Sequence, residues 1–416
     1  MNLLSDIRAY EILDSRGNPT LKTELIFHDG KIIDAAVPSG ASKGTHEAVE
    51  LRDGDLSRYR GLGLLNVINM INTVIKPQIV GKEFPDQKAV DDLLIALDGT
   101  QNKSHLGANT ILSISLAFAR AFASYKNVPL FSYIAETYGR KPALISVTPM
   151  FNIINGGLHS MNGLSIQEFL LVPNPKRPFK EAIKIGIDIY QALKEKLILE
   201  KKPIGLGDEG GYAPHFEKDE DALELLKTVI ETSGYKFGED VSLSLDLAAS
   251  TYYKDGFYTL SGIPNQLDLS SYIETVKGLV TNYQLFSIED PIQEDDWEAW
   301  ATLTRMVSDT CLVIGDDLLV TNLNRLNTAI EKKACNAILV KPNQIGTVTE
   351  TLSVIRRARE ANFKIIISHR SGETNDDFIA DLAVGVGADF VKFGAPARGE
   401  RVAKYNRLSY LYERYG

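Results

Sequence analysis

One pattern runs through residues 243–392 in six places, LSLD (243–246), LFSIE (285–289), CLVIGD (311–316), AILVK (337–341), KIIISH (364–369) and FVK (390–392). Each is a short apolar run that ends abruptly at a residue able to carry charge. From the second run onward the polar ends recur roughly every 25 residues, the length of one strand plus one helix. Such runs are typical of parallel strands buried on both faces. The pattern predicts a (β/α) barrel, in which the carboxyl ends of all strands meet at one mouth.

Three of these runs end in carboxylates, Asp246, Glu289 and Asp316. At the end of a single strand, such a residue is most often a cap for the next helix. Three acids converging from three strands would repel one another unless a cation lay among them. Hard carboxylate oxygens are the ligands that Mg²⁺ prefers. We therefore predict that these three residues bind Mg²⁺ at the barrel mouth.

Two other runs end in lysines, Lys341 and Lys392. Ion pairs with the acids are one interpretation, because lysine is seldom buried without a partner. The alternative is that a metal ion and the second ammonium lower the pKa of one lysine, which could then act as a general base. A base, a metal ion and an acid such as Glu209 suit removal of a proton next to a carboxylate, followed by loss of a leaving group. Arg370 and Ser371 add a guanidinium and a hydroxyl that suit a phosphate.

Residues 205–211, Gly-Leu-Gly-Asp-Glu-Gly-Gly, hold two carboxylates among four glycines. This glycine content fits no regular element, so Asp208 and Glu209 are predicted to lie on an irregular functional loop. A solvated acidic turn is the alternative. The histidines without a convergent partner in the sequence are predicted to be surface or loop residues; these are His28, His46, His105 and His215.

The bulk composition limits the classes of protein that the chain can belong to. Its 416 residues suggest more than one domain, unless a barrel takes up most of them. The net charge of −9 does not favour binding to nucleic acid or to an anionic membrane. No signal peptide or membrane-spanning stretch is expected. Cys311 and Cys335 lie in or beside apolar runs and are predicted to be free core thiols, which points to a reducing compartment and a cytoplasmic protein.

Residues 1–138 are predicted to form a smaller α+β domain. In residues 1–30, apolar and polar side chains alternate on both sides of a turn, which predicts two strands. Residues 31–37 are predicted to form a further strand. Residues 64–138 follow a helical pattern. Within them, residues 109–123 are apolar nearly all round, which predicts a buried helix.

Small residues at 38–44 connect these strands and helices. They form either an ordinary surface turn or a mobile lid whose Ser39 reaches a bound ion or ligand. The domain boundary is predicted at residues 138–139, because a helix ends there and Pro-flanked strands follow. Residues 139–416 would then form the barrel domain.

Short motifs along the whole chain are specific when they are taken together. They are EILDSRGNPT (11–20), PSGAS (38–42), LGAN (106–109), GDEGG (207–211), SIEDP (287–291), GDD (315–317), KPNQIGT (341–347), SHRSGET (368–374) and GERVAKYN (399–406). At these residues the sequence resembles the enolase family. Chance does not supply all of these motifs in order.

The resemblance implies both a fold and a reaction. The fold is α/β, a modified (β/α)8 barrel with irregular first units, preceded by the smaller α+β domain. The reaction is the reversible dehydration of 2-phosphoglycerate to phosphoenolpyruvate in glycolysis. It requires two Mg²⁺ per active site, the second bound with the substrate. A homodimer or an octamer is also implied.

The resemblance assigns roles to individual residues. The implied catalytic residues are Glu209, Lys341, Glu168, His159 and His369. The implied substrate-binding residues are Gln167, Lys341, Arg370, Ser371 and Lys392. The implied metal ligands are Asp246, Glu289, Asp316 and, for the second ion, Ser39. Among them Lys341 would take the C2 proton, and Glu209, supported by Glu168, would assist the departure of hydroxide.

Some residues depart from the family pattern near the two loops beside the site; these are Lys43, Leu62, Leu158, Ser160 and Met161. We expect them to change loop closure or KM rather than to abolish activity. Two alternatives remain open at this point. One is a related dehydratase that acts on another carboxylate, such as an acid sugar. The other is a protein of this fold with an additional binding or scaffold role, at a cell surface or in an RNA-processing assembly.

Overall fold

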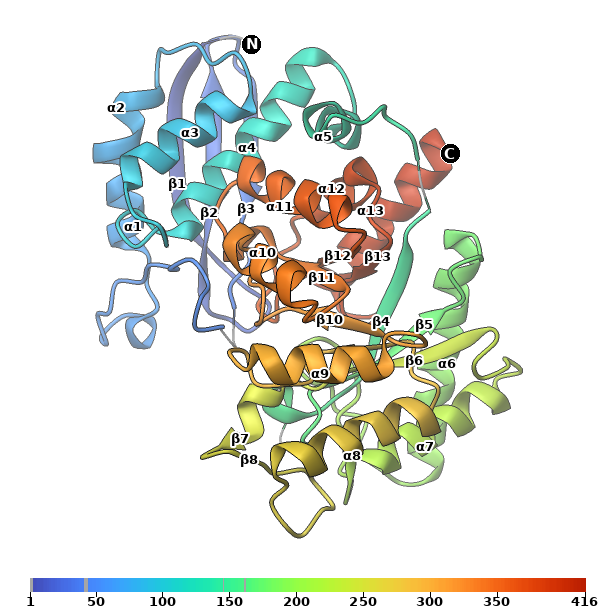
Figure 1. Ribbon diagram of the computed structural model, residues 1–416. Helices are drawn as coiled ribbons and strands as arrows, with labels where there is room; N and C mark the ends of the chain where they lie inside the picture. The colour runs from blue at the N-terminus through green and yellow to red at the C-terminus, as the bar shows by residue number, and fades with distance from the viewer. Residues whose placement is uncertain (1–2, 41–43, 145, 161) are drawn as a thin grey trace.

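The computed structural model describes residues 3–40, 44–144, 146–160 and 162–416. Figure 1 shows two parts, a small sheet with helices in the N-terminal third of the chain and a closed barrel with surrounding helices in the remainder. This architecture confirms the predicted fold class. The predicted domain boundary lies at the end of helix α5, at Tyr138, and stays a prediction.

The first part begins with an antiparallel sheet. Its order is β1 (Leu4–Leu13), β2 (Pro19–Phe27) and β3 (Ile32–Ala36). Asp14 holds the predicted turn between β1 and β2, because its Oδ1 accepts the backbone N–H groups of Arg16 and Asn18 at 2.9 and 2.8 Å. Gly17 completes the turn with a φ of +76°, a conformation that a residue with a Cβ adopts only with strain.

Helices follow this sheet in the sequence. Their bounds are η1 (Tyr59–Gly61), α1 (Leu65–Met70), the π-helical turn η2 (Ile71–Ile75), α2 (Lys76–Ile79), α3 (Gln87–Asp98), α4 (Ala108–Lys126) and α5 (Leu130–Tyr138). The predicted buried helix is α4, which packs against β2 and β3 and is buried without interruption from Ala108 to Ala119. Small and apolar side chains on every face allow α4 to be enclosed in this way.

The barrel closes through strands in the order β10, β11, β12, β13, β4, β5, β6 and β9. Their bounds are β4 (Thr148–Asn155), β5 (Glu168–Pro173), β6 (Val241–Asp246), β9 (Ser287–Glu289), β10 (Leu312–Gly315), β11 (Ala337–Val340), β12 (Lys364–Ser368) and β13 (Phe390–Lys392). Strand β5 runs antiparallel to β4 and β6, whereas the other neighbouring strands are parallel. An antiparallel pair needs no crossover helix, and this explains why the first units are irregular.

Helices surround the barrel in Figure 1. They are α6 (Phe179–Leu199), α7 (Asp219–Thr232), α8 (Leu269–Asn282), α9 (Trp297–Val307), α10 (Leu323–Lys332), α11 (Val348–Glu360), α12 (Phe378–Val386) and α13 (Gly399–Tyr415). Short 3-10 turns and a hairpin complete the fold; these are η3 (Gly157–His159), η4 (Ala249–Tyr252), η5 (Pro342–Gln344), β7 (Tyr253–Lys254) and β8 (Phe257–Tyr258). The apolar pattern predicted α6, α8 and α11 to within about two residues at each end.

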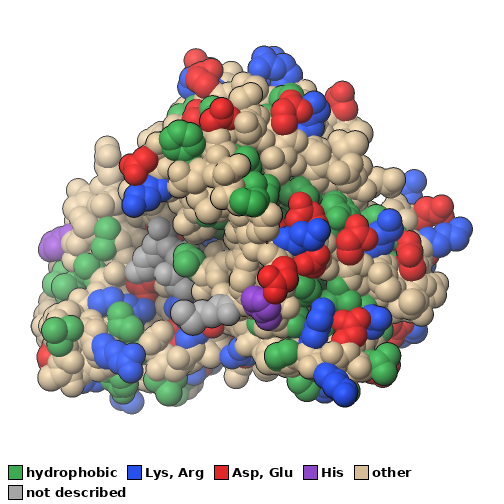
Figure 2. All heavy atoms as spheres, turned by 90° about the horizontal axis from the view of Figure 1, so that it is seen from below, with side chains coloured by type: hydrophobic (Ala, Val, Ile, Leu, Met, Phe, Trp, Pro, Cys, Tyr) green, Lys and Arg blue, Asp and Glu red, His purple; other side chains and the backbone are tan. Residues whose placement is uncertain are grey.

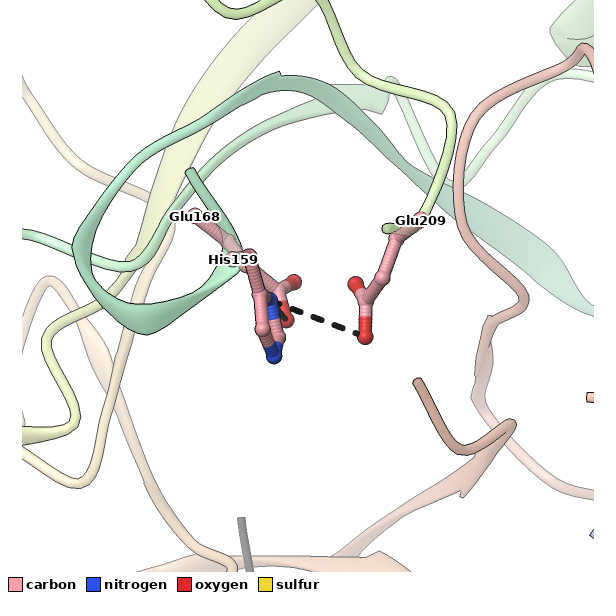
Figure 3. Close-up of side chains that lie close together, drawn as sticks. All are labelled: His159, Glu168 and Glu209. Carbon is pink, nitrogen blue, oxygen red and sulfur yellow. Dashed lines mark ion pairs between the residues drawn. The ribbon is translucent and has the colours of Figure 1, made fainter. Parts of the chain in front are cut away.

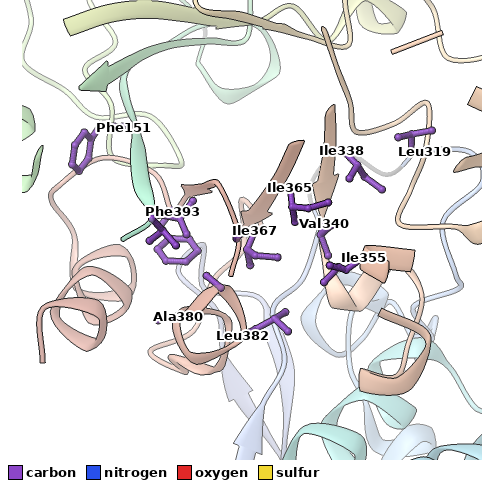
Figure 4. Close-up of a cluster of buried hydrophobic side chains, with 14 of the residues drawn as sticks. Phe151, Leu319, Ile338, Val340, Ile355, Ile365, Ile367, Ala380, Leu382 and Phe393 are labelled. Atoms are coloured by element: carbon purple, nitrogen blue, oxygen red, sulfur yellow. The ribbon is translucent and has the colours of Figure 1, made fainter. Parts of the chain in front are cut away.

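The barrel strands are buried on both faces, as their continuous apolar runs predicted. In β11, Ala337 and Leu339 belong to a cluster that also holds Ile314 and Ile366, from the two neighbouring strands. Residues 338 and 340 of the same strand pack on the other face, into the core that Figure 4 shows between the strands and helices α11 and α12. The side-chain period of two therefore places one half of each run in each core.

Gly186 of α6 marks the closest approach between that helix and the barrel. A Cβ added there would lie 2.3 Å from a ring carbon of Phe151 in β4. We expect Gly186→Ala to lower the free energy of unfolding by about 1–3 kcal/mol, measured by urea denaturation, because the ring is enclosed and cannot retreat. The matched control is Gly278→Ala in α8, where an added Cβ meets nothing within 4 Å. That change should leave stability unchanged or raise it by up to about 1 kcal/mol, and similar losses in both variants would contradict this account.

Both cysteines are free and buried, as predicted. Burial raises the pKa of the Cys311 thiol to about 12. Acidic and basic side chains are interspersed on the face of the molecule shown in Figure 2. Among the described residues, no helix combines the length and the apolar character that crossing a membrane requires.

Candidate active site at the carboxyl ends of the barrel strands

A polar cavity lies at the mouth that the strand ends were predicted to form. It is lined by His159, Gln167, Glu168, Glu209, Asp246, Ala248, Asp290, Asp316, Asp317, Lys341, Ser368, His369, Arg370, Ser371 and Lys392. The predicted site residues are thus brought together, except that Glu289, which pairs with Lys392, and Ser39 are not part of the lining. Side chains more than 200 residues apart in the chain meet here, because the parallel strands end at this mouth and the antiparallel strand β5 begins there, at Glu168.

Lys392 lies at the centre of one group of carboxylates. Its Nζ is 3.0 Å from Asp246 Oδ2, 2.8 Å from Glu289 Oε2 and 3.0 Å from Glu168 Oε2. Asp246 and Glu289 are register partners on the neighbouring strands β6 and β9, so their side chains leave the barrel side by side. Burial disfavours the charge on Lys392, but these carboxylates outweigh it and raise its pKa well above the ordinary value.

Lys341 and Asp316 form the second ion pair of the cavity; Asp316 is buried, and the side chain of Lys341 is 14 % exposed. Burial lowers the pKa of Lys341, but the Asp316 carboxylate outweighs burial and raises it. Of the two interpretations of this lysine, the structure shows the ion pair; a lowered pKa requires the charge of a metal ion as well. Gln344 of η5 also holds Asp316, because its Nε2 donates to Asp316 Oδ1 at 3.0 Å.

Negative charge is in excess around these two lysines. Burial and the Asp246 carboxylate raise the pKa of Glu289 well above its ordinary value. Burial and the Asp316 carboxylate raise the pKa of Asp317 to about 8. Buried carboxylates that resist ionisation suit a divalent cation, and the available donors are hard oxygens. The residues therefore fit Mg²⁺.

Asp290 is an acidic residue for which the sequence reasoning proposed no role. Its carboxylate accepts the backbone N–H groups of Asp316 at 3.0 Å and Asp317 at 2.7 Å. One oxygen from each of these three acids lies within 4.8 Å of the others, so Asp316 also belongs to a second carboxylate group. Because its oxygens accept these backbone donors, Asp290 fixes the position of the backbone that carries Asp316 and Asp317.

A second constellation consists of His159, Glu168 and Glu209, which point toward one another in Figure 3. His159 Nδ1 lies 3.9 Å from Glu168 Oε1 and 3.8 Å from Glu209 Oε1, and all three side chains are buried. Burial and the Glu209 carboxylate raise the pKa of Glu168 well above its ordinary value. The pKa of Glu209 shifts the other way: burial raises it, but His369 and His159 outweigh burial and lower it well below the ordinary value, so Glu168 is the member of the pair that holds a proton more readily than an isolated acid would.

Glu209 is also positioned by two groups that lie on other elements. Asn152 of β4 donates from Nδ2 to Glu209 Oε2 at 2.9 Å. His369 follows β12, and its Nε2 lies 3.3 Å from the same oxygen. Sequence reasoning missed Asn152, although a single amide inside the apolar run of β4 was the signal that could have revealed it.

Arg370 and Ser371 lie where the sequence predicted a phosphate clamp. The Arg370 guanidinium donates to both carboxylate oxygens of Glu47, at 2.9 and 3.1 Å, and to Asn343 Oδ1 at 3.1 Å. Glu47 also accepts the backbone N–H of Gly44 at 3.1 Å, so it joins the end of the 38–44 segment to this arginine. Glu47 and Arg370 are 323 positions apart in the chain, so no local sequence pattern could predict that they pair.

Ser39 does not line the cavity that the strand-end carboxylates form. Its backbone pairs with Gly372, and its hydroxyl donates to Asp14 Oδ2 at 2.5 Å. Its role toward a second ion stays a prediction. Of the residues that depart from the family pattern, Lys43 and Met161 are outside the described residues. Leu158 is 67 % exposed, and Ser160 Oγ donates to the carbonyl of Asn155 at 3.0 Å.

Comparison with known families agrees with this geometry over nearly the whole chain. Residues 4–134 match the family model described as the enolase N-terminal domain. Residues 143–416 match the model described as the enolase C-terminal TIM barrel domain, and they contain every residue that lines the cavity. The first matched region contains the small sheet and its helices, and the second contains the closed barrel. The chain therefore belongs to the enolase family.

Proposed function

We propose that this protein catalyses the reversible, Mg²⁺-dependent dehydration of 2-phosphoglycerate to phosphoenolpyruvate. The observation that carries the proposal is one cavity that holds a partly buried ammonium at Lys341, a buried carboxyl pair at Glu168 and Glu209, and a guanidinium at Arg370. A base, an acid and a phosphate-binding group are the three functions that this reaction requires.

The first chemical step would break the C2–H bond of the substrate. Lys341 Nζ takes the proton, and the bonding electrons move into the adjacent carboxylate, which then carries a second negative charge. Lys392 is the ammonium placed to neutralise part of that charge. Mg²⁺ held by Asp246, Glu289 and Asp316 would supply the remaining positive charge and favour the neutral form of the lysine base.

The second step would break the C3–O bond. The electrons return from the carboxylate to form the C2–C3 double bond, and the hydroxide leaves as water after it receives a proton from Glu209. The raised pKa of Glu168 supports this step, because Glu168 keeps a proton beside the leaving group even though His369 and His159 lower the pKa of Glu209. The imidazole of His159 lies within 4 Å of both carboxyl groups.

The remaining residues would bind the substrate. Arg370 and Ser371 suit its phosphate, since a guanidinium forms paired hydrogen bonds with phosphate oxygens. Gln167 lines the same cavity and adds an amide. We also propose that Ser39 contributes to the second ion when the substrate phosphate is present, and that the protein forms a homodimer or an octamer, which light scattering distinguishes.

The direct test is an assay for product. With Mg²⁺ present, purified protein is expected to convert 2-phosphoglycerate to phosphoenolpyruvate, followed by absorbance, and a chelator should stop the reaction. Hydroxy acids without a phosphate should be poor substrates, because they lack the group that Arg370 and Ser371 are proposed to bind. Failure to form phosphoenolpyruvate would refute the proposal, and turnover of an acid sugar would favour the related dehydratase.

A further inference from the structure

The guanidinium of Arg401 lies directly beside His369 in the cavity wall. Arg401 belongs to the first turn of α13 and is fully buried. Its Nη1 lies 2.7 Å from His369 Nδ1, and its Nη2 donates to the carbonyls of Ser371 at 2.6 Å and Asp208 at 3.0 Å. These contacts connect the loop of Glu209 with the residues that follow β12.

The contact with the histidine has only one chemically reasonable direction. A guanidinium has five N–H donors and no acceptor, so His369 Nδ1 must present its lone pair to Arg401. The ring proton of a neutral imidazole then resides on Nε2, the nitrogen that lies 3.3 Å from Glu209 Oε2. A doubly protonated ring would direct an N–H group at the guanidinium and would be repelled.

We propose that Arg401 is a positioning residue that holds His369 as the neutral Nε2–H tautomer, so that the proton of the ring always lies on the nitrogen nearest to Glu209. His369 is then not a proton carrier. The proton for the leaving hydroxide comes from the Glu168 and Glu209 pair alone. The consequence for turnover rests on the proposed function, whereas the tautomer itself does not.

The surroundings of the ring support the neutral form. Burial lowers the pKa of His369 to about 3, with Arg401 and Lys392 acting in the same direction and Glu209 in the opposite one. His369 is 2 % exposed, so water does not compete for either nitrogen. These are the charged groups that act on the imidazole from the elements packed around it.

The tautomer can be measured on the ligand-free protein by NMR of ¹⁵N-labelled histidine. The signals of His369 are identified as those missing from the spectrum of His369→Gln. The expected result is a protonated Nε2 and an unprotonated Nδ1, unchanged across neutral pH. A proton on Nδ1, or an imidazolium, would overturn the proposal whether or not the protein dehydrates 2-phosphoglycerate.

Two substitutions test the part played by Arg401. Arg401→Lys keeps a group that can only donate, so the Nε2–H tautomer should persist. Arg401→Gln offers an amide oxygen that can accept from Nδ1, so the second tautomer should appear, and kcat should fall by about 100-fold with a much smaller change in KM. A folded Arg401→Gln protein with the single Nε2–H tautomer would refute the role of Arg401. If that variant does not fold, the spectra of the parent and Arg401→Lys decide.

The matched control is Arg398→Gln. Arg398 precedes α13 and also donates to backbone carbonyls, those of Gly207 at 3.1 Å and Ser15 at 3.2 Å, but it does not contact the imidazole. Its replacement should leave the His369 tautomer unchanged. A tautomer change in this control would show that any loosening of the loop is sufficient, and it would overturn the specific role of Arg401.

Discussion

Replacing Lys341 with alanine is expected to lower turnover of 2-phosphoglycerate by about 10²–10⁴-fold, the range that a general base contributes. Exchange of the C2 proton with solvent, followed by NMR in deuterated water, should fall by the same factor, because both measurements depend on the same proton transfer. Loss of Lys341 also leaves Asp316 without its ion-pair partner, so Mg²⁺ should bind at least as well to the variant.

The control for this substitution is Lys364→Ala. Lys364 stands at the opposite end of the neighbouring strand β12, half exposed, and pairs with Asp389 at 3.1 Å. Its removal should change stability by no more than about 1 kcal/mol and leave proton exchange unaltered. If exchange in Lys341→Ala continues at the parental rate, the base has been assigned to the wrong residue.

Glu289→Gln is expected to reduce Mg²⁺ affinity on the order of 100-fold, because it removes one charged oxygen ligand from the set of three. Without Mg²⁺ the variant should unfold at the same temperature as the parent or higher. The reason is that folding raises the pKa of Glu289, so its ionised form is less stable in the folded chain than in the unfolded one. An uncharged amide of the same shape removes this penalty, which applies at pH values above the ordinary pKa of a glutamate.

Thermal unfolding measured with and without Mg²⁺ tests both parts of this prediction. Ligand binding raises the melting temperature of the parent by mass action, and this rise should be largely lost in Glu289→Gln. The exposed residue Glu298, at the start of α9, provides the control Glu298→Gln, which should keep the full rise. A full rise in Glu289→Gln would mean that the strand-end acids do not hold the ion.

The fold could be predicted from local patterns to a large extent. The six apolar runs became barrel strands that end at the predicted polar residues or directly before them, as β11 does at Lys341. Helix α7 and the β7–β8 hairpin were not predicted. Helix α7 carries a helical apolar period at Leu223, Leu226 and Ile230 that could have revealed it, although its first turn is acidic. Each hairpin strand has only two residues, which is too short for an apolar period.

The candidate site was predicted less evenly. The strand-end acids and lysines were found because each ends an apolar run, where a charge is conspicuous. Asn152, Asp290 and Glu47 were missed, because their hydrogen bonds to Glu209, Asp316 and Arg370 are made across the cavity or between the two parts of the chain. Residues of this kind look like ordinary polar positions until their partners are known.

The sequence by itself determined the strand ends, their charges and therefore the presence of a cationic and acidic mouth, because strand periodicity and burial are properties of a few consecutive residues. Only the tertiary structure decided which charges face each other. Lys392 is shared by Asp246, Glu289 and Glu168, while Asp316 is held by Lys341. The nitrogen of His369 that carries the proton likewise depends on Arg401, 32 residues away in the chain. A hydrogen bond depends on where its partner lies in space and not on the order of residues in the sequence.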